Sequence, residues 1–270
     1  VVAENAGGSG LSEVEHTLFF RELGRVCGPL DVLAQSLAAA CVQNDTLRSD
    51  IISGKVGVAL IARDGNRFRL LGDPGAMYGL HTTPADSNLI PLASVDAEAR
   101  PFLDPVNTQR VCKALPTPIH TCVGNRTWVL GQLATAAMLV GVAEAALTVI
   151  VEYAKVRETF GRKIGSWQAV RHPCAHMAVK LEAARAQLWF AATACKERRR
   201  DAIAHLTAAK HLANTAAYMN ADISIQLHGG IGITEEHCAH VMLKHSLVLS
   251  RLFGGKRDLL GQLLHANLDD

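Results

Sequence analysis

The spacing of apolar residues divides the chain into two helical zones with a zone of short strands between them. In the first zone, up to residue 53, four apolar residues recur at helical spacing behind a capping Ser12: Val14, Leu18, Phe19 and Leu23. Gly24 and Pro29 predict the end of this helix, and a second apolar helix is expected from Leu30 to Cys41. Residues 1–53 are therefore predicted to form an N-terminal helical domain.

The middle zone changes from helical spacing to short apolar runs separated by turn residues. The runs cover residues 56–61, 68–71 and 87–92, and clusters of Asp, Gly, Pro and Asn lie between them. Runs of this length bounded by turn residues are typical of strands. Asp64-Gly65 is a tight-hairpin signal. Residues 54–120 are therefore predicted to form a β domain.

The third zone, residues 121–270, is rich in alanine and leucine and predicts four long helices. Their expected ranges are 132–157, 172–196, 202–227 and 235–252. Long helices with short connections are typical of a helix bundle. The predicted fold class is therefore α+β and mostly α, with a C-terminal four-helix bundle.

Charge and apolar length exclude two classes of partner. The formal net charge is only +2, which gives no electrostatic footprint for nucleic acid. The most apolar window, residues 129–151, carries Gln132 and Glu144 and is better interpreted as a buried bundle helix than as a membrane span. We therefore expect neither a nucleic-acid nor a membrane partner.

The cysteines indicate the cellular compartment of the protein, and the first residues indicate whether sequence is missing before Val1. The seven cysteines are scattered and form no C-x-x-C pair, so they indicate reduced thiols in a cytoplasmic protein. No signal peptide is visible, and the chain opens at Val1 without a methionine. We expect an upstream stretch to be missing and the N-terminal domain to be incomplete.

Two motifs in the third zone carry candidate chemistry. The first, residues 153–168, ends a helix in a glycine-containing turn that includes Arg157-Glu158-Thr159-Phe160-Gly161. An arginine fork suits a pyrophosphate, and Phe160 or Trp167 could cover a flat ring. The alternative is a basic helix end followed by an ordinary loop.

The second motif is Gln226-Leu227-His228-Gly229-Gly230-Ile231-Gly232. Glycines let a backbone approach a ligand closely, and their exposed N–H groups can meet an anion. The alternative here is a glycine that caps the C-terminus of a helix. Each motif alone leaves both readings open.

In this order on a helical bundle, the pair R-x-x-F-G and Q-x-x-G-G-x-G resembles the C-terminal domain of the acyl-CoA dehydrogenase family. The likeness extends more weakly over the rest of the chain. The resemblance implies a helical domain, a β domain and a four-helix bundle. It also implies FAD at a subunit interface, oxidation of acyl-CoA to 2-enoyl-CoA, and electron-transferring flavoprotein as the acceptor.

The resemblance assigns FAD contacts residue by residue. From the first motif it implies that Arg157, Thr159 and Phe160 touch FAD and that Ile164, Trp167 and Val170 line the site. From the second motif it implies that Gln226, Leu227, Gly229 and Gly230 meet the pyrophosphate. In the family these contacts commonly reach the flavin held by a neighbouring subunit.

The catalytic half of the family pattern is missing. Chemistry needs a carboxylate to take the α-proton while hydride leaves for the flavin. The two positions where family members carry that glutamate fall on Phe253 and near Gly131, and neither residue can accept a proton. In the β domain, the segment facing the flavin ring offers only Tyr78, Thr82 and Thr83 as substitutes.

This combination resembles the subunit without a base in bacterial α2β2 acyl-CoA dehydrogenases that act on steroid side-chain CoA thioesters, as in cholesterol breakdown. The resemblance implies that a catalytic partner supplies the glutamate. No catalytic residue and no metal ligand are therefore assigned to this chain.

Two alternatives stay open. One is an active homo-oligomer with an unusual base, for which Glu235, Glu236 and Glu144 are the candidates; Glu235 and Glu236 are otherwise first-turn acids behind an N-capping Thr234. The other is a flavin-free structural subunit. His237 and His240 could share one helix face, but no third metal ligand is evident.

Overall fold

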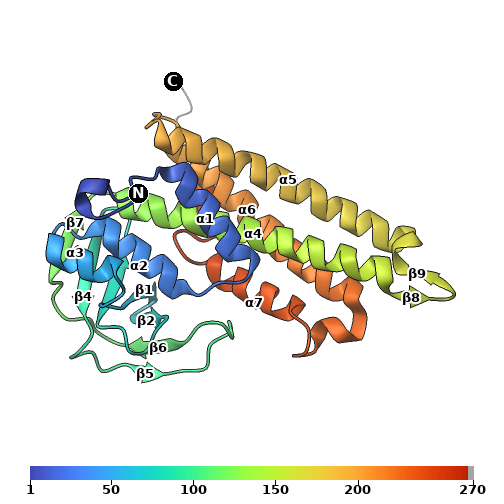
Figure 1. Ribbon diagram of the computed structural model, residues 1–270, viewed down its shortest axis with the longest axis horizontal. Coiled ribbons are helices and arrows are strands. Elements are labelled where there is room, and N and C mark those ends of the chain that lie inside the picture. Colours follow the sequence, from blue (N-terminus) through green and yellow to red (C-terminus); the bar gives the residue numbers. More distant parts are fainter. Residues whose placement is uncertain (267–270) are drawn as a thin grey trace. The chain divides into compact units, whose positions relative to one another are not determined.

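The computed structural model describes residues 1–266, which form mostly helix together with one seven-stranded sheet (Figure 1). The predicted α+β, mostly α class is confirmed. By compactness the chain falls into two units. Unit 1 joins residues 1–16 to residues 28–132, and unit 2 joins residues 17–27 to residues from 133 onward. The domain boundaries expected at residues 53 and 120 stay predictions.

Unit 1 contains the short helix η1 (Glu4–Ala6) and the helices α2 (Leu30–Cys41) and α3 (Asp45–Ile52). The predicted range of α2 is confirmed. Pro29 is extended at the N-cap, where its missing N–H costs nothing, and the buried face of α2 packs on β1 and β3. The side chain of Asn44 caps α3 by accepting the N–H of Leu47 at 2.9 Å.

The sheet of unit 1 follows the order β5-β6-β2-β1-β3-β4-β7. Its strands are β1 (Val58–Asp64), β2 (Arg67–Leu71), β3 (Tyr78–Thr82), β4 (Asp86–Pro91), β5 (Glu98–Ala99), β6 (Gln109–Cys112) and β7 (His120–Val123). β1 and β3 run parallel, and the other neighbours are antiparallel. The hairpin predicted at Asp64-Gly65 is confirmed, because Gly65 turns the chain between β1 and β2 with a φ of +60°.

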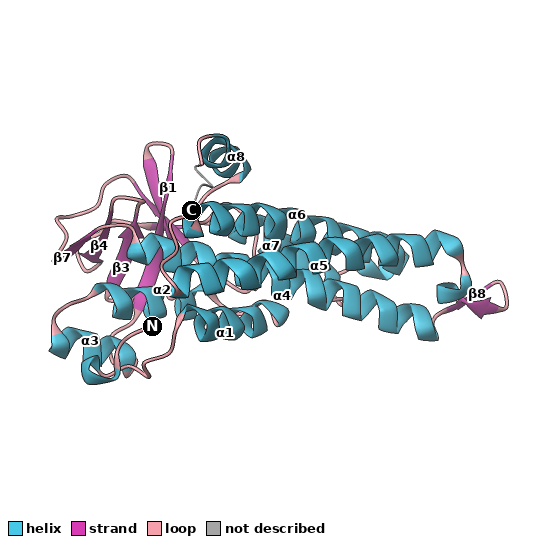
Figure 2. Cartoon of the chain, turned by 90° about the horizontal axis from the view of Figure 1, so that it is seen from above, coloured by secondary structure: helices cyan, strands magenta, loops and turns pink. Residues whose placement is uncertain are grey.

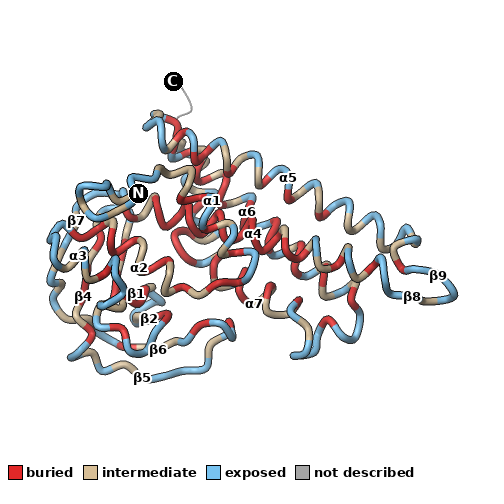
Figure 3. The backbone as a smooth tube through the Cα atoms, in the orientation of Figure 1, coloured by how far each residue is buried: buried red, intermediate tan, exposed pale blue. Residues whose placement is uncertain are grey.

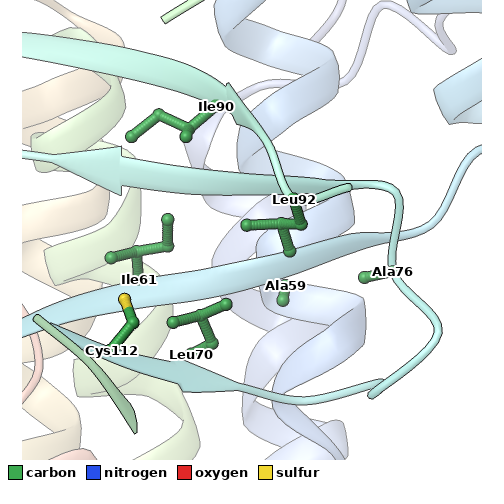
Figure 4. Close-up of a cluster of buried hydrophobic side chains, with 7 residues drawn as sticks. All are labelled: Ala59, Ile61, Leu70, Ala76, Ile90, Leu92 and Cys112. Atoms are coloured by element: carbon green, nitrogen blue, oxygen red, sulfur yellow. The ribbon is translucent and has the colours of Figure 1, made fainter. Parts of the chain in front are cut away.

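A cluster of buried apolar side chains packs on one face of this sheet (Figure 4). Ala59 and Ile61 are two residues apart on β1, so both side chains project to the same side of the strand. Their neighbours in the cluster come from β2, β4, β6 and the connecting loops: Leu70, Ala76, Ile90, Leu92 and Cys112. Burying one such leucine or isoleucine contributes about 1.5–3 kcal/mol. The packing of this face therefore depends on alternation along each strand.

Unit 2 is a helix bundle that carries both motifs. It contains the part of α1 (Glu13–Arg25) that begins at Thr17 and the part of α4 (Arg126–Val156) that begins at Leu133. The elements that follow are β8 (Glu158–Thr159), β9 (Arg162–Lys163), η2 (Ile164–Ser166), α5 (Gln168–Lys196), α6 (Ala202–His228), η3 (Gly229–Ile233), α7 (Ala239–Leu249) and α8 (Lys256–Leu264). Figure 2 shows α4, α5 and α6 running along one another, with the β8–β9 hairpin beyond the ends of α4 and α5. The buried Asn220 amide of α6 donates to Ala143 O and Met177 O, at 3.1 and 3.2 Å, and so ties α6 to both α4 and α5.

Two glycines allow α1 and α4 to approach closely. A Cβ at Gly24 would lie 2.1 Å from the carbonyl oxygen of Met138, and a Cβ at Gly141 would lie 2.1 Å from the carbonyl oxygen of Arg21. Neither position accepts a larger residue without moving a helix. The helix was expected to end between Gly24 and Pro29, and this is confirmed, because α1 ends at Arg25. Gly24 lies in the last turn of α1 and also allows the close helix packing.

Three helix starts differ from the expected ones. α4 begins at Arg126 rather than Gln132. α5 begins at Gln168 rather than His172, and Pro173 lies inside it. α7 begins at Ala239, with Cys238 at the N-cap, rather than at Glu235. The interpretation of Thr234 as an N-cap is therefore wrong; its hydroxyl donates to Ile231 O at 2.8 Å and closes η3 instead.

The long helix α4 is apolar enough to cross a membrane by length and composition, although 72% of its most apolar window is buried. Figure 3 shows this burial along most of α4, in contrast to the mixed exposure of α5. Such burial is typical of the central helix of a bundle. The interpretation of residues 129–151 as a buried bundle helix is confirmed.

Candidate cofactor-contacting site

The first motif folds as a two-residue hairpin at the end of α4. Thr159 pairs with Arg162, and the two residues between them, Phe160 and Gly161, have φ values of +51° and +78°. Two consecutive positive φ values are the pattern of a type I′ turn, which favours Asn-Gly or Gly-Gly over an aromatic residue. Phe160 nevertheless occupies the strained position and is 94% exposed. Strain at an exposed aromatic side chain indicates a functional role.

Arg157 and Trp167 lie on either side of this hairpin. The N–H of Arg157 donates to Tyr153 O and the N–H of Ile164 donates to Arg157 O, both at 2.9 Å, which fixes the base of the turn. Across residues 1–266 the Arg157 guanidinium has no hydrogen-bonding partner, so it is free to bind an anion. The Trp167 ring lies 3.4 Å beneath the guanidinium carbon of Arg162 in a cation–π contact.

A groove of about 440 Å³ opens between the C-terminal turns of α4 and the first turns of α5. Its apolar lining comes from Val151, Ala154 and Val170, and Arg171 lies at the same groove with no ionic partner in the described chain. Val170 therefore lies beside an open groove, and its predicted contact with the cofactor stays a prediction. Ile164 is only 8% exposed and supports the floor of the hairpin.

The second motif ends α6 and exposes two glycines. Gly229 has a φ of +67°, and no atom lies within 4 Å of a Cβ built on Gly229 or Gly230. Gln226 is exposed and Leu227 is half-buried just before them. Gly232, in contrast, is buried, because a Cβ there would lie 2.5 Å from Ile225 O. The open side of the loop can therefore accept a ligand at its backbone.

The two motifs meet through an aromatic contact. Tyr153 lies one turn before Arg157, and its ring centroid is 4.6 Å from that of His228, which immediately precedes Gly229. This contact places the end of α4 beside the end of α6. An unpartnered guanidinium, an exposed aromatic ring and two open glycines then lie within one region of unit 2. These are the groups that a dinucleotide cofactor needs, and in that chemical sense the residues fit FAD.

Neither position expected for a catalytic base carries a proton acceptor. Phe253 is 5% exposed with a φ of +55°, and Gly131 lies inside α4. A buried amine lies near the first of these positions: Lys210 Nζ donates to Leu249 O, at the end of α7, at 2.8 Å. Complete burial lowers the pKa of Lys210 well below its ordinary value.

The other candidate carboxylates have no site around them. Glu235 and Glu236 are exposed in the turn before α7. Glu144 accepts from Arg21 at 2.7–3.0 Å through both of its oxygens, so the two side chains form a bidentate ion pair. A carboxylate held in a bidentate pair is poorly suited to remove a proton.

The hydroxyls of the β domain are engaged within unit 1. Thr82 Oγ1 is buried and lies 2.6 Å from Ser87 Oγ, and Thr83 Oγ1 donates to Asp86 Oδ1 at 2.7 Å. Tyr78 is half-buried on β3. These contacts stabilise the β3–β4 hairpin, and they leave the two threonine hydroxyls turned toward their own strand pair.

The histidines form no metal site in the described chain. His237 lies in the turn before α7 and His240 lies inside α7, so the expectation that they share a helix face is wrong. Across residues 1–266 no three His, Cys, Asp or Glu side chains lie close enough to hold a metal ion. All seven cysteines lie within residues 1–266, and none of them forms a disulfide there.

Comparison with known proteins identifies the family. The C-terminal domain of the acyl-CoA dehydrogenases matches residues 126–268. The chain is 32% identical to acyl-CoA dehydrogenase IpdE2 of Mycobacterium tuberculosis over 97% of its own length and 80% of that protein. The chain therefore belongs to the acyl-CoA dehydrogenase family, whose members bind FAD.

Other relatives agree with this assignment. Acyl-CoA dehydrogenase FadE34 of Mycobacterium tuberculosis is 33% identical over 94% of this chain, and the chain spans only 38% of that relative. The Tcur3481-Tcur3483 steroid acyl-CoA dehydrogenase variant superposes with a TM-score of 0.81 at 23% identity, over 97% of this chain and 82% of that chain. The ChsE4-ChsE5 complex of Mycobacterium tuberculosis gives 0.79 at 23% identity, over 98% and 83%. At such identities these structures show the shared fold.

Two residues at the meeting point of the motifs had no predicted role. Tyr153 and His228 stood inside the motifs but were not assigned contacts, and Arg171 was not singled out. The one sequence signal for the ring contact is that each aromatic residue ends a long helix beside a motif. That signal gives no distance between them.

Proposed function

We propose that this chain is the subunit of an FAD-dependent acyl-CoA dehydrogenase that contributes cofactor contacts and assembly, while a partner subunit supplies the catalytic glutamate. The observation that carries the proposal is a combination of two features. Arg157, Phe160 and the Gly229-Gly230 loop are exposed in one region of unit 2, while Phe253 and Gly131 occupy the positions of the base. A chain that keeps one half of a shared site and lacks the other half needs a second subunit.

In this proposal each residue has a definite task. Arg157 binds a phosphate oxygen of FAD through its free guanidinium, and Gln226 and the open amides of Gly229 and Gly230 bind the pyrophosphate. Phe160 and Trp167 cover a flat ring of the cofactor, and Thr159, Ile164, Val170 and Leu227 shape the surface beneath it. FAD, when bound, accepts hydride from the β-carbon of the thioester.

The proposed assembly, substrate and electron acceptor follow from likeness to relatives. A solved steroid acyl-CoA dehydrogenase and the heteromeric ChsE4-ChsE5 complex share the fold, which supports a heterotetramer acting on a steroid side-chain CoA thioester. Electron-transferring flavoprotein is the proposed acceptor, as is usual in the family. The seven cysteines form no disulfide within residues 1–266, which supports the proposal of a reducing, cytoplasmic location.

A pair of arginine variants tests the cofactor role. In the complex with the partner subunit, Arg157→Ala is expected to raise the Kd for FAD about tenfold, since one charge-assisted phosphate contact is worth about 1.5–3 kcal/mol. Arg200→Ala removes another exposed arginine, outside both motifs, and should leave the Kd for FAD unchanged. Equal FAD affinity in the wild-type and Arg157→Ala complexes would overturn the assignment.

A panel of thioesters tests the substrate class. The complex is expected to reduce its flavin with steroid side-chain CoA thioesters and to be at least tenfold slower with straight-chain thioesters of four to eight carbons. The opposite order would reject the steroid assignment and leave the subunit role intact.

A further inference from the structure

Three rings form a continuous stack that links three elements of unit 2. Tyr153 of α4 lies 4.6 Å from His228 of α6, and His228 lies 4.2 Å from His237 in the turn before α7. The interplanar angles are 38° and 46°, so the rings are tilted but in contact. Aromatic contacts at these distances are attractive beyond the area they bury.

His228 is fixed at the centre of the stack. Its side chain is 4% exposed, and its Nδ1 lies 2.6 Å from the carbonyl oxygen of Ser224. Because a carbonyl oxygen only accepts, Nδ1 carries the proton in the neutral ring, and Nε2 is then an acceptor. Burial and the nearby His237 lower the pKa of His228, which favours the neutral ring at neutral pH.

His237 is fixed in turn by the start of α7. Its Nδ1 accepts the N–H of Ala239 at 3.2 Å, which orients the ring against His228. The loop between the two histidines folds back on the same residue, because a Cβ at Gly232 would lie 2.9 Å from His228 Cβ. The position of Gly229 and Gly230 therefore depends on where His228 lies.

The buried Nε2 of His228 has no hydrogen-bonding partner among the described residues. A buried acceptor without a donor is costly, and folded proteins leave few of them. It lies on the residue that precedes the two open glycines, so a donor on a bound ligand or a bridging water would satisfy it.

We propose that His228 is a positioning residue: stacked between Tyr153 and His237, it holds the Arg157 hairpin and the Gly229-Gly230 loop in the register that one dinucleotide can span. The inference rests on the proposed function and adds to it a residue that touches neither the acyl group nor the reacting atoms. The contact that matters is ring on ring, so a ring that retains the stack should retain the register.

The test compares variants that keep a ring with variants that remove it. Tyr153→Leu and His228→Leu remove a ring, while Tyr153→Phe and His228→Phe keep one. Phe190→Leu is the matched control, because Phe190 of α5 makes a similar contact with His205 of α6, 4.4 Å between centroids, outside both motifs. Each chain is examined alone by hydrogen exchange, and then in the complex by FAD titration.

In the free chain, both leucine variants are expected to speed amide exchange at residues 229–233 while leaving the middle of α5 unchanged. In the complex they should raise the Kd for FAD up to about tenfold, and Tyr153→Phe should restore the wild-type value. Phe190→Leu should lower the Tm about as much as Tyr153→Leu does, and it should leave the Kd for FAD unchanged.

Unchanged exchange at 229–233 in both leucine variants would overturn the proposal, as would a Phe190→Leu complex that loses as much FAD affinity as the Tyr153→Leu complex. If a leucine variant does not fold, the same comparison is made between wild type and His228→Phe, which must keep slow exchange at 229–233. A wild-type complex that binds no FAD would reject the proposed function alone, because the exchange of the free chain still decides the role of the stack.

Discussion

Arg21 of α1 donates hydrogen bonds to both carboxylate oxygens of Glu144 of α4, with N–O distances of 2.7–3.0 Å. The two side chains are 17% and 18% exposed, so water screens the pair only partly. The contact lies one helical turn from the position where Gly24 and Gly141 bring the two helices together. Glu144 therefore holds α1 on α4, and its pairing with Arg21 makes it poorly suited to act as a base.

Glu144→Gln is expected to lower the free energy of unfolding by about 1–3 kcal/mol, since it leaves a partly buried guanidinium without its counter-charge. Urea denaturation measures the loss. Glu152→Gln breaks the exposed pair with Lys155 and should change stability by less than about 0.5 kcal/mol. Turnover of the complex should be unaffected by either change; a hundredfold loss in Glu144→Gln with unchanged stability would make Glu144 the base.

Gly141→Ala tests the close packing of α1 on α4. The added methyl would lie 2.1 Å from Arg21 O, a backbone atom that cannot turn aside, so we expect a loss of about 1–3 kcal/mol. Gly261→Ala is the control, because Gly261 lies in α8 with no atom within 4 Å of its Cβ position. There alanine should stabilise the chain by about 0.5–1 kcal/mol. Equal effects of the two changes would refute the close contact.

Phe160→Asn separates stability from cofactor binding. Asparagine tolerates the positive φ that phenylalanine adopts in this turn, so the free energy of unfolding should rise by about 1 kcal/mol. The complex should bind FAD more weakly, because the 94% exposed ring is lost from the cofactor surface. Thermal unfolding and FAD titration measure the two effects. A rise in both stability and FAD affinity would contradict the role given to Phe160.

The burial of His16 predicts that the folded chain loses stability in acid. Burial lowers its pKa to about 4, below the ordinary value of about 6.5, while Leu130 O lies 3.2 Å from Nε2. The folded chain thus binds fewer protons than the unfolded chain between these values. Stability from this group is complete above pH 6.5 and falls as the pH drops toward 4, by about 3 kcal/mol in all.

The check is to measure unfolding free energy from pH 7.5 to 4.5 for wild type and His16→Leu. The wild type should lose about 2 kcal/mol more than the variant over this range. Parallel pH curves for the two proteins would show that His16 does not titrate differently in the folded and unfolded chains.

Local patterns were enough to predict several elements. α2 runs from Leu30 to Cys41 as expected, because Pro29 fixes its start and its apolar residues repeat at helical spacing. The short strands β6 and β7 had no comparable signal. They exist because Gln109–Cys112 pairs with β2 and His120–Val123 pairs with β4, and such pairing over long sequence distances leaves no local pattern.

The start of α7 shows the opposite failure, in which a local pattern was misleading. Thr234-Glu235-Glu236 has the composition of a helix N-terminus, yet the His237 ring takes the N–H of Ala239 and the helix begins there. The same ring completes the stack on His228. The residues of the site were thus recognisable as motifs, whereas the contact that brings the motifs together depends on the folded bundle.

The most direct test of the central claim is to purify this chain alone and together with its catalytic partner, and to compare flavin per polypeptide and acyl-CoA dehydrogenation. If a partner supplies the base, the chain alone is colourless and inactive, and the complex is active with about one flavin per pair of subunits. A chain that alone binds flavin and turns over acyl-CoA would contradict it, because Phe253 and Gly131 leave this chain without a base at either family position.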